Sequence, residues 1–179
     1  MRGELRAIDP EERFRQSRDA VARLLAIPEL SSARTLLLFR ALATEVDTAD
    51  VLTQALSRDV FVFCPRLAET SLSFVRVNAD TLWAAGAFGV PEPVSGDVLT
   101  EAQVDHGAVV VVPGLAFSER RDRLGRGAGD YDRALAAPPL AGRAIAVGLA
   151  FDFQIVPELA VAAHDVPMDV VVTDRRVIR

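Results

Sequence analysis

The sequence has no lysine, a single cysteine and few aromatic residues. Because all twenty basic residues are arginine, any phosphate-binding site must be built from arginine, backbone N–H groups or a metal ion. The single cysteine, Cys64, excludes an internal disulfide and a cysteine-rich metal site. It ends the apolar run that starts at Val60, and this position favours a buried side chain over a nucleophile.

The sequence also lacks an apolar run long enough to cross a bilayer. The longest runs, such as Ala108 to Val112 and Val170 to Val172, are far too short. Met1 to Arg6 lacks the apolar core of a signal peptide. The net charge of −5 gives no reason to expect nucleic acid as a partner. We therefore expect a cytoplasmic protein that binds neither membranes nor nucleic acid.

The composition that is present is that of a globular domain. Half of the 179 residues are apolar and a quarter are charged. A chain of this length can bury roughly two-thirds of its unfolded surface. Since no repeat, linker or composition shift divides the sequence, we expect one domain over residues 1–179.

Helix-like and strand-like segments alternate along the chain. Asp9 followed by Pro10 and two glutamates is typical of a helix start, and Phe14, Ser17, Val21, Leu24 and Leu25 then share one face. Further helices are predicted after Asp47 or Thr48 and from Asp130 to Ala137. Strands are predicted at Thr35 to Phe39, Val60 to Cys64 (ended by Pro65), Leu72 to Val77, Ala108 to Val112, Ala144 to Phe151 and Met168 to Thr173. This alternation predicts an α/β fold with a mostly parallel sheet covered on both faces.

The segment from Arg123 to Arg133 contains the clearest chemical signal. Three glycines in five residues, Gly125, Gly127 and Gly129, permit positive φ angles and a close approach of the backbone to a ligand. Successive N–H groups and the following helix start can hold phosphate oxygens, and Arg123 and Arg126 can add bidentate contacts. The spacing matches neither a Walker A motif nor a Rossmann fingerprint. On these grounds alone, phosphate binding and a plain flexible loop remain equal alternatives.

Several motifs in order along the chain resemble those of the 5-formyltetrahydrofolate cyclo-ligase family. The most specific is Val112-Pro113-Gly114-Leu115-Ala116-Phe117 followed by Arg123-Leu124-Gly125-x-Gly127-x-Gly129-x-Tyr131-Asp132. Similar matches are Arg2-x-x-Leu5-Arg6, Glu45-Val46-Asp47-Thr48, Phe88-Gly89-Val90-Pro91-Glu92-Pro93 and His164-Asp165-Val166-Pro167-Met168-Asp169-Val170-Val171-Val172-Thr173. The resemblance covers nearly the whole chain and implies a three-layer α/β/α sandwich with a mostly parallel central sheet.

The resemblance also implies an activity and a set of site residues. The reaction would be the ATP- and Mg²⁺-dependent closure of 5-formyltetrahydrofolate to 5,10-methenyltetrahydrofolate, in a monomer or weak homodimer. ATP would be bound by Arg2, Arg6, Arg123, Leu124, Gly125, Arg126, Gly127, Ala128, Gly129, Asp130 and Tyr131. The folate would contact Arg40, Glu45, Phe88, Arg126, Gly127 and Gly129. Asp132 and Asp165 would hold Mg²⁺, and Arg123, Arg126 and Asp132 would be catalytic.

Some residues depart from the family pattern or have a simpler interpretation. Arg2 replaces a lysine, Ala128 a glycine or lysine, and Asp130 a tyrosine, while Ser118 and Arg121 alter the segment before the loop. Asp130 is a good helix N-cap, yet its carboxylate would repel bound phosphate unless metal or Arg126 offsets it. Three acids have plain structural interpretations: Asp132 and Asp165 as cap or turn residues, and Glu45 as a first-turn acid. A diverged paralogue and a non-catalytic nucleotide- or folate-binding protein remain alternatives.

Overall fold

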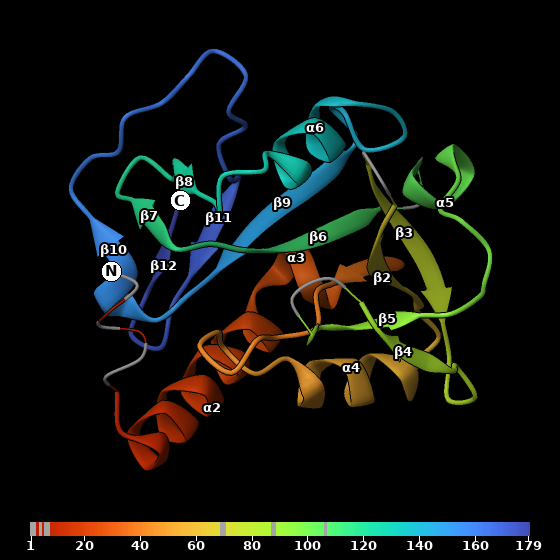
Figure 1. The fold of residues 1–179 in the computed structure, drawn as a ribbon, viewed down its shortest axis with the longest axis horizontal. Helices are drawn as coiled ribbons and strands as arrows, with labels where there is room; N and C mark the ends of the chain where they lie inside the picture. The colour runs from red at the N-terminus through yellow and green to blue at the C-terminus, as the bar shows by residue number, and fades with distance from the viewer. Residues whose placement is uncertain (1–2, 4, 6–7, 69–70, 87–88, 106) are drawn as a thin grey trace.

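A seven-stranded sheet forms the centre of the molecule (Figure 1). The structure is a computed structural model that describes residues 3, 5, 8–68, 71–86, 89–105 and 107–179. The strands are β1 (Thr35–Leu38), β2 (Phe61–Leu67), β3 (Leu72–Val77), β6 (Ala108–Pro113), β9 (Ala144–Leu149), β11 (Val170–Val172) and β12 (Val177–Ile178). Their order is β12-β11-β9-β6-β1-β2-β3. All neighbours are parallel except the two edge strands, β3 and β12, which pair antiparallel.

Helices cover both faces of this sheet. On one face lie α2 (Pro10–Ala26), α3 (Pro28–Ser31) and α4 (Ala49–Leu56), and on the other α5 (Glu101–Asp105) and α6 (Asp130–Ala136). The central strand β6 shows why: Val109 and Val111 belong to the core beneath α2 and α4, whereas Val110 and Val112 belong to the core beneath α5 and α6. A strand buried on both sides has no wet face, hence its unbroken valines. The prediction of a mostly parallel three-layer α/β/α sandwich is confirmed.

The first long helix begins where the sequence predicted. The Asp9 carboxylate accepts hydrogen bonds from the N–H groups of Glu11 at 2.9 Å and Glu12 at 3.3 Å, so Asp9 is the N-cap. Ser17, Val21 and Leu24 are buried as expected. Phe14 was wrongly assigned to the inner face, since it is 65% exposed. The amino-terminal turns of α2 extend beyond the sheet, so this part of the apolar stripe meets no core (Figure 1).

The prediction that Pro65 ends the second strand is wrong. β2 continues through it to Leu67, and Pro65 lies opposite Phe74 of β3. On its other side, β2 is paired with β1 only over Phe61 to Phe63. A missing N–H at Pro65 therefore costs no ladder hydrogen bond on the β1 side. The extension matters because the end of β2 forms part of the candidate site.

Two segments for which the sequence predicted no helix or strand contain short strands. The Gly86–Gly96 segment holds β5 (Pro91–Pro93), which forms a hairpin with β4 (Trp83–Ala85). The segment after β6 holds β7 (Ala116–Ser118) and β8 (Arg123–Leu124), which form a small sheet with β10 (Ile155–Val156) beyond the 3₁₀ turn η2 (Asp152–Gln154).

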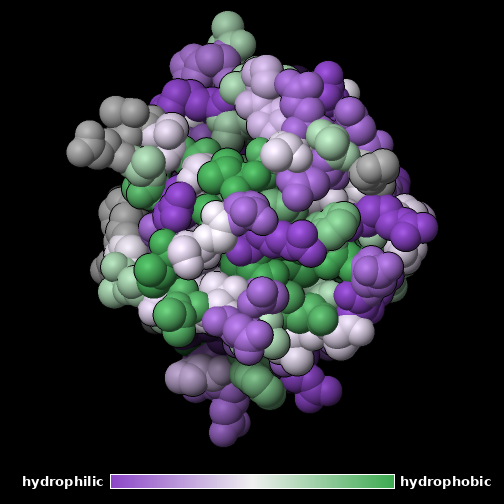
Figure 2. All heavy atoms as spheres, turned by 90° about the vertical axis from the view of Figure 1, so that its right-hand side faces the viewer, coloured by the Kyte–Doolittle hydropathy of each residue, from purple (hydrophilic) through white to green (hydrophobic). Residues whose placement is uncertain are grey.

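Figure 2 views the molecule from the side of β3 and α5, where apolar and polar residues are interspersed.

Within the part of the chain that the structure describes, no helix has the length and apolar character needed to span a membrane. Cys64 is fully buried and unpaired, as its sequence position predicted. Burial raises the pKa of its thiol to about 12, against a smaller lowering by the positive charge of Arg40. A thiol held protonated in this way is a packing residue and a poor nucleophile.

Candidate active site

The candidate site lies where the chain connections of the sheet diverge. From β1 the chain passes to β2 and β3 on one side, then returns to β6, β9 and β11 on the other. Ligands of open α/β sheets bind at the carboxyl ends of the strands at such a switch point. Phe39 and Arg40, which follow β1, and Pro113 and Gly114, at and after the end of β6, line one cavity of about 200 Å³. The topology therefore selects this cavity independently of any motif.

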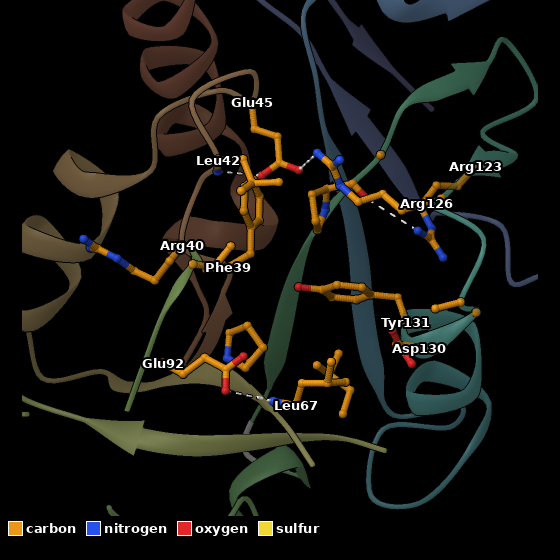
Figure 3. A pocket seen from close by; sticks show the side chains of 18 residues that line it. Phe39, Arg40, Leu42, Glu45, Leu67, Glu92, Arg123, Arg126, Asp130 and Tyr131 are labelled. Carbon is orange, nitrogen blue, oxygen red and sulfur yellow. Dashed lines mark hydrogen bonds and ion pairs between the residues drawn. The ribbon is translucent and has the colours of Figure 1, made fainter. Parts of the chain in front are cut away.

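Three parts of the chain form the walls of the cavity (Figure 3). One is the loop from β1 to α4, which contributes Leu42 and Glu45. The second is apolar and comes from the end of β2, the start of β3 and the β4–β5 hairpin. The third is the glycine-rich loop with the first turn of α6, which carries Tyr131. An apolar side thus faces a side rich in arginine and backbone N–H groups.

The backbone of the glycine-rich loop requires its glycines. Gly127 has φ +105° and Gly129 has φ +69°, a region that other residues rarely adopt. Gly129 is the N-cap of α6, and Asp130 is the first residue inside the helix. The expectation that Asp130 caps the helix is therefore wrong, because the left-handed turn that starts the helix occurs one residue earlier, where glycine is favoured.

Arg123 and Asp132 form a buried ion pair behind the loop. An Arg123 Nη donates to the Asp132 carboxylate at 2.6 Å, and the two side chains are 5% and 12% exposed. The guanidinium also lies 5.7 Å from the centre of the Tyr131 ring. It packs against Gly125, where an added Cβ would lie 2.8 Å from Nη1. Arg123 therefore holds the loop against α6 from within.

Arg126 and Glu45 form a second ion pair, across the mouth of the cavity (Figure 3). An Arg126 Nη donates to Glu45 Oε1 at 3.0 Å, while the N–H of Leu42 donates to Oε2 at 2.9 Å. The Arg126 side chain is 41% exposed and that of Glu45 only 12%. Glu45 precedes α4, which begins at Ala49, so it is not the first-turn acid that its sequence position also allowed. The pair joins the loops that follow β1 and β6.

Asp130 is paired with an arginine that the sequence did not single out. Arg133, one helical turn on, donates to the Asp130 carboxylate at 2.5 Å and to the Ala128 carbonyl at 2.6 Å. Its positive charge offsets that of the Asp130 carboxylate, which lies beside the glycine-rich loop predicted to bind phosphate. An acid at helix position one with an arginine three residues later is a signal the sequence contained.

Tyr131 points its hydroxyl into the cavity (Figure 3). Its ring packs edge-to-face on Phe74, with the centroids 6.4 Å apart. Burial, followed by the negative charge of Glu45, raises the pKa of the phenol far above its usual value, although Arg123 opposes the shift. The hydroxyl therefore stays protonated and is available as a hydrogen-bond donor.

The two predicted metal-binding aspartates lie on adjoining segments. The N–H of Val166, next to Asp165, donates to Asp132 Oδ1 at 3.3 Å. Asp165 Oδ2 accepts from the N–H of Ala162 at 2.7 Å, and the Asp165 side chain is 30% exposed. Over the described residues no group of three or more His, Cys, Asp or Glu side chains could hold a metal. Two hard carboxylates completed by substrate phosphates would suit Mg²⁺, which rarely uses an all-protein cage.

The remaining predicted site residues do not all border the cavity. Arg40 borders the cavity, but its guanidinium lies over the Trp83 ring, 5.2 Å from the centroid. Leu124 belongs to β8 and is largely exposed. Arg2, Arg6 and Phe88 lie outside the residues that the structure describes. Glu92 borders the cavity from β5, although its sequence motif predicted no role for it.

Comparisons with known proteins agree with this fold. Residues 1–174 match the model of the 5-formyltetrahydrofolate cyclo-ligase family. The chain belongs to the 5-formyltetrahydrofolate cyclo-ligase family. This is a family of ligases, so its reaction is nucleotide-dependent.

Individual relatives extend over almost the whole chain. The 5-formyltetrahydrofolate cyclo-ligase of Mus musculus is 30% identical over 92% of this chain and 85% of its own length. That of Escherichia coli K12 is 30% identical over 96% and 95%. The solved structure of Aquifex aeolicus 5,10-methenyltetrahydrofolate synthetase, 31% identical, covers 99% of this chain and 87% of its own with a TM-score of 0.83. The resemblance stated from the motifs is confirmed.

Proposed function

We propose that this protein closes 5-formyltetrahydrofolate to 5,10-methenyltetrahydrofolate in a reaction that consumes ATP, requires Mg²⁺ and releases ADP and phosphate. The observation that carries the proposal is the cavity at the switch point. It places an apolar wall, suited to a flat heterocycle, opposite a loop of glycines and arginines, suited to phosphate. The names of the relatives supply the substrate that fits such a two-sided cavity.

The glycine-rich loop would bind the phosphates of ATP. Its positive-φ glycines let N–H groups turn toward an anion, and Arg126 is exposed enough to exchange Glu45 for a phosphate oxygen. Arg2 and Arg6 would complete this subsite, as the motif match implies. Arg123 would act behind the loop by fixing its shape, because its guanidinium is already buried against Asp132.

The opposite side would bind the pterin part of the folate. Glu45 and Arg40 would contact it from the β1–α4 loop, and Phe88 would also contact it, as the motif match implies. Tyr131 would offer its protonated hydroxyl as a donor inside the cavity. Gly127 and Gly129 would lie beside the formyl group where it reaches the phosphate subsite, as the motif match implies. The formyl oxygen and the terminal phosphate would then meet beside Arg126.

Asp132 and Asp165 would hold Mg²⁺, directly or through water; at Asp132 the second lone pairs of the carboxylate would serve, because its two oxygens already accept from Arg123 and from the Val166 N–H. When bound, the ion neutralises phosphate charge in the transferring group. In the overall reaction the formyl oxygen receives the terminal phosphoryl group, N10 attacks the activated carbon, and phosphate leaves. Such a transfer depends mainly on positioning and charge neutralisation, which the arginines and backbone N–H groups supply.

Of the departures from the family pattern, Asp130 was the one that favoured a protein without this activity. The ion pair with Arg133 reduces that objection, because the negative charge beside the loop has a counter-charge at 2.5 Å. The geometry therefore supports the ligase over a non-catalytic nucleotide- or folate-binding protein.

Incubation of the purified protein with ATP, Mg²⁺ and 5-formyltetrahydrofolate tests the proposal. We expect the near-ultraviolet absorbance of the methenyl product to appear, and to require all three components. Thermal-shift measurements with ATP and the folate, separately and together, identify a binding protein without activity. Stabilisation by both ligands without product, across several metals and pH values, would reject the ligase.

A further inference from the structure

Among the three carboxylates that line the cavity, Glu92 is the one without a cationic partner among the residues that the structure describes. Glu45 is paired with Arg126 and Asp130 with Arg133. For Glu92 the described residues supply no arginine within 4.0 Å, and its single hydrogen bond is a long one, 3.3 Å from the N–H of Leu67 to Oε2. Its other oxygen, Oε1, accepts no hydrogen bond from the described residues, so it is available to a ligand.

The hairpin holds the Glu92 side chain in a defined place. Glu92 lies on β5 opposite Ala84 of β4. The side chain passes over Gly86, where an added Cβ would lie 2.2 Å from its Cδ and 2.4 Å from Oε1. It continues toward Leu67 at the end of β2 (Figure 3). The absence of a side chain at Gly86 therefore leaves the space that the carboxylate occupies.

The surroundings of Glu92 make a charged ligand group or an N–H donor the natural partner. Pro65, Leu67, Leu72 and Val90 line the same part of the cavity and provide no side-chain donor. A half-buried carboxylate that faces apolar side chains is unfavourable unless hydrogen bonds compensate it. Since the described protein residues provide only one weak donor, the carboxylate is left to solvent or to a bound ligand.

We infer that Glu92 binds the pyrimidine edge of the pterin, an inference that rests on the proposed function. This edge of a 2-amino-4-oxopteridine presents two adjacent donors, N3–H and the 2-amino group. Their spacing matches the two oxygens of one carboxylate, as in a bidentate guanidinium pair. Glu45 is less suited to this contact, because it is paired with Arg126 beside the glycine-rich loop, where the reacting end of the folate is placed.

The assignment also orients the substrate. Glu92 and Arg126 lie on opposite sides of Tyr131 in the cavity (Figure 3). With its pyrimidine edge at Glu92, the pterin directs its other ring, which carries the 5-formyl group, toward Arg126 and the glycine-rich loop. Glu92 is therefore a positioning residue, remote from the reacting atoms, that sets the register of the folate.

Binding of a matched ligand pair tests the inference. The probes are 5-formyltetrahydrofolate and its analogue with a methyl group in place of the 2-amino group. We expect the parent protein to bind the amino compound roughly 10- to 100-fold more tightly, the range of a charge-assisted hydrogen bond. Glu92→Ala should lose this discrimination by weakening only the amino compound. Glu158→Ala, an exposed acid beside Arg120, is the matched control and should keep it.

Gly86→Ala provides a second, independent variant. Its added methyl group meets the flexible end of the Glu92 side chain, so the fold can accommodate it by displacing the carboxylate. We expect the same loss of discrimination although Glu92 is still present. Unchanged ATP affinity and an unchanged unfolding temperature show that each variant is folded.

The outcomes separate this inference from the proposed function. If the parent protein forms the methenyl product but Glu92→Ala and Gly86→Ala discriminate as well as the parent does, the pyrimidine edge binds elsewhere and only this inference fails. If the parent protein binds neither folate and forms no product, the proposed function fails, and the inference fails with it. Loss of discrimination in both variants, with product formation intact in the parent, supports both.

Discussion

Arg123 and Arg126 come from the same glycine-rich loop, yet their environments are opposite. The Arg123 side chain is 5% exposed and its partner Asp132 lies in the first turn of α6. The Arg126 side chain is 41% exposed and its partner Glu45 belongs to a different loop across the cavity. A pair with both side chains buried is costly to break, whereas an arginine that lies partly in water is easier to release, although its partner Glu45 is only 12% exposed. The comparison indicates that Arg123 shapes the loop and that Arg126 is the arginine able to change partners.

Breaking the buried pair should have the largest effect on stability. Arg123→Ala leaves Asp132 buried without its counter-charge, and the free energy of unfolding should fall by about 3–5 kcal/mol. Asp132→Asn changes the other partner of this ion pair, so it should also destabilise the protein. It should abolish turnover as well. Chemical denaturation measures both changes. Arg126→Ala is the matched control and should cost less than Arg123→Ala, because the Arg126 side chain is 41% exposed; equal losses at the two arginines would refute the comparison.

Removing the exposed arginine should instead affect the reaction. Arg126→Ala removes a donor from the site where phosphate charge develops, and kcat/KM should fall by roughly 100- to 1000-fold. The near-ultraviolet product assay measures this loss. Arg120→Ala, which removes an exposed arginine of the β7–β8 connection, should leave kcat/KM unchanged. A fully active Arg126→Ala protein would show that the pair with Glu45 is only structural.

At the proposed metal site, Asp165→Asn should have a smaller effect on turnover, and this effect should depend on the Mg²⁺ concentration. EDTA should stop the reaction and excess Mg²⁺ should restore it. Asp165→Asn removes one of two carboxylates and should lower turnover about tenfold at limiting Mg²⁺, with partial recovery at high Mg²⁺. Glu119→Gln, an exposed acid that pairs with Arg176, is the control. A reaction insensitive to EDTA would remove both aspartates from the metal site.

The smallest effect concerns the third ion pair of the loop. An unpaired Asp130 carboxylate would repel bound phosphate, but Arg133 already offsets its charge. In the parent protein, Asp130→Asn should therefore change the Kd for ATP by less than about threefold. Arg133→Ala removes the counter-charge of Asp130, so the carboxylate should repel the phosphates and weaken ATP binding about tenfold. Asp130→Asn should restore affinity in that background, and failure to do so would show that Asp130 does not affect the phosphates.

The sequence predicted the sheet and its helices well because these segments have clear patterns. Unbroken valines at Ala108 to Val112 predicted the central strand, and Asp9-Pro10 predicted the start of α2. It failed where tertiary contacts decide: Pro65 remains inside β2, and Phe14 lies beyond the core. The short strands of the hairpin and of the β7–β8 sheet have no periodic pattern to detect.

For the candidate site, the sequence identified the loop but not its ion pairs. Arg123 and Arg126 looked equivalent, since burial by α6 and contact with a distant glutamate are not visible in a linear motif. Glu92 had a motif but no role, because its position depends on the hairpin and on the space above Gly86. Arg2, Arg6 and Phe88 lie outside the described residues, so their roles stay predictions.

The most direct test of the proposed activity is the stoichiometry of ATP use. Purified protein, Mg²⁺ and a limiting amount of 5-formyltetrahydrofolate should yield one ADP and one phosphate for each methenyl product formed. Without the folate, ATP should remain intact, because the phosphoryl acceptor is the formyl oxygen. ATP hydrolysis at the same rate with and without the folate, or methenyl product formed without consumption of ATP, would contradict the proposed function.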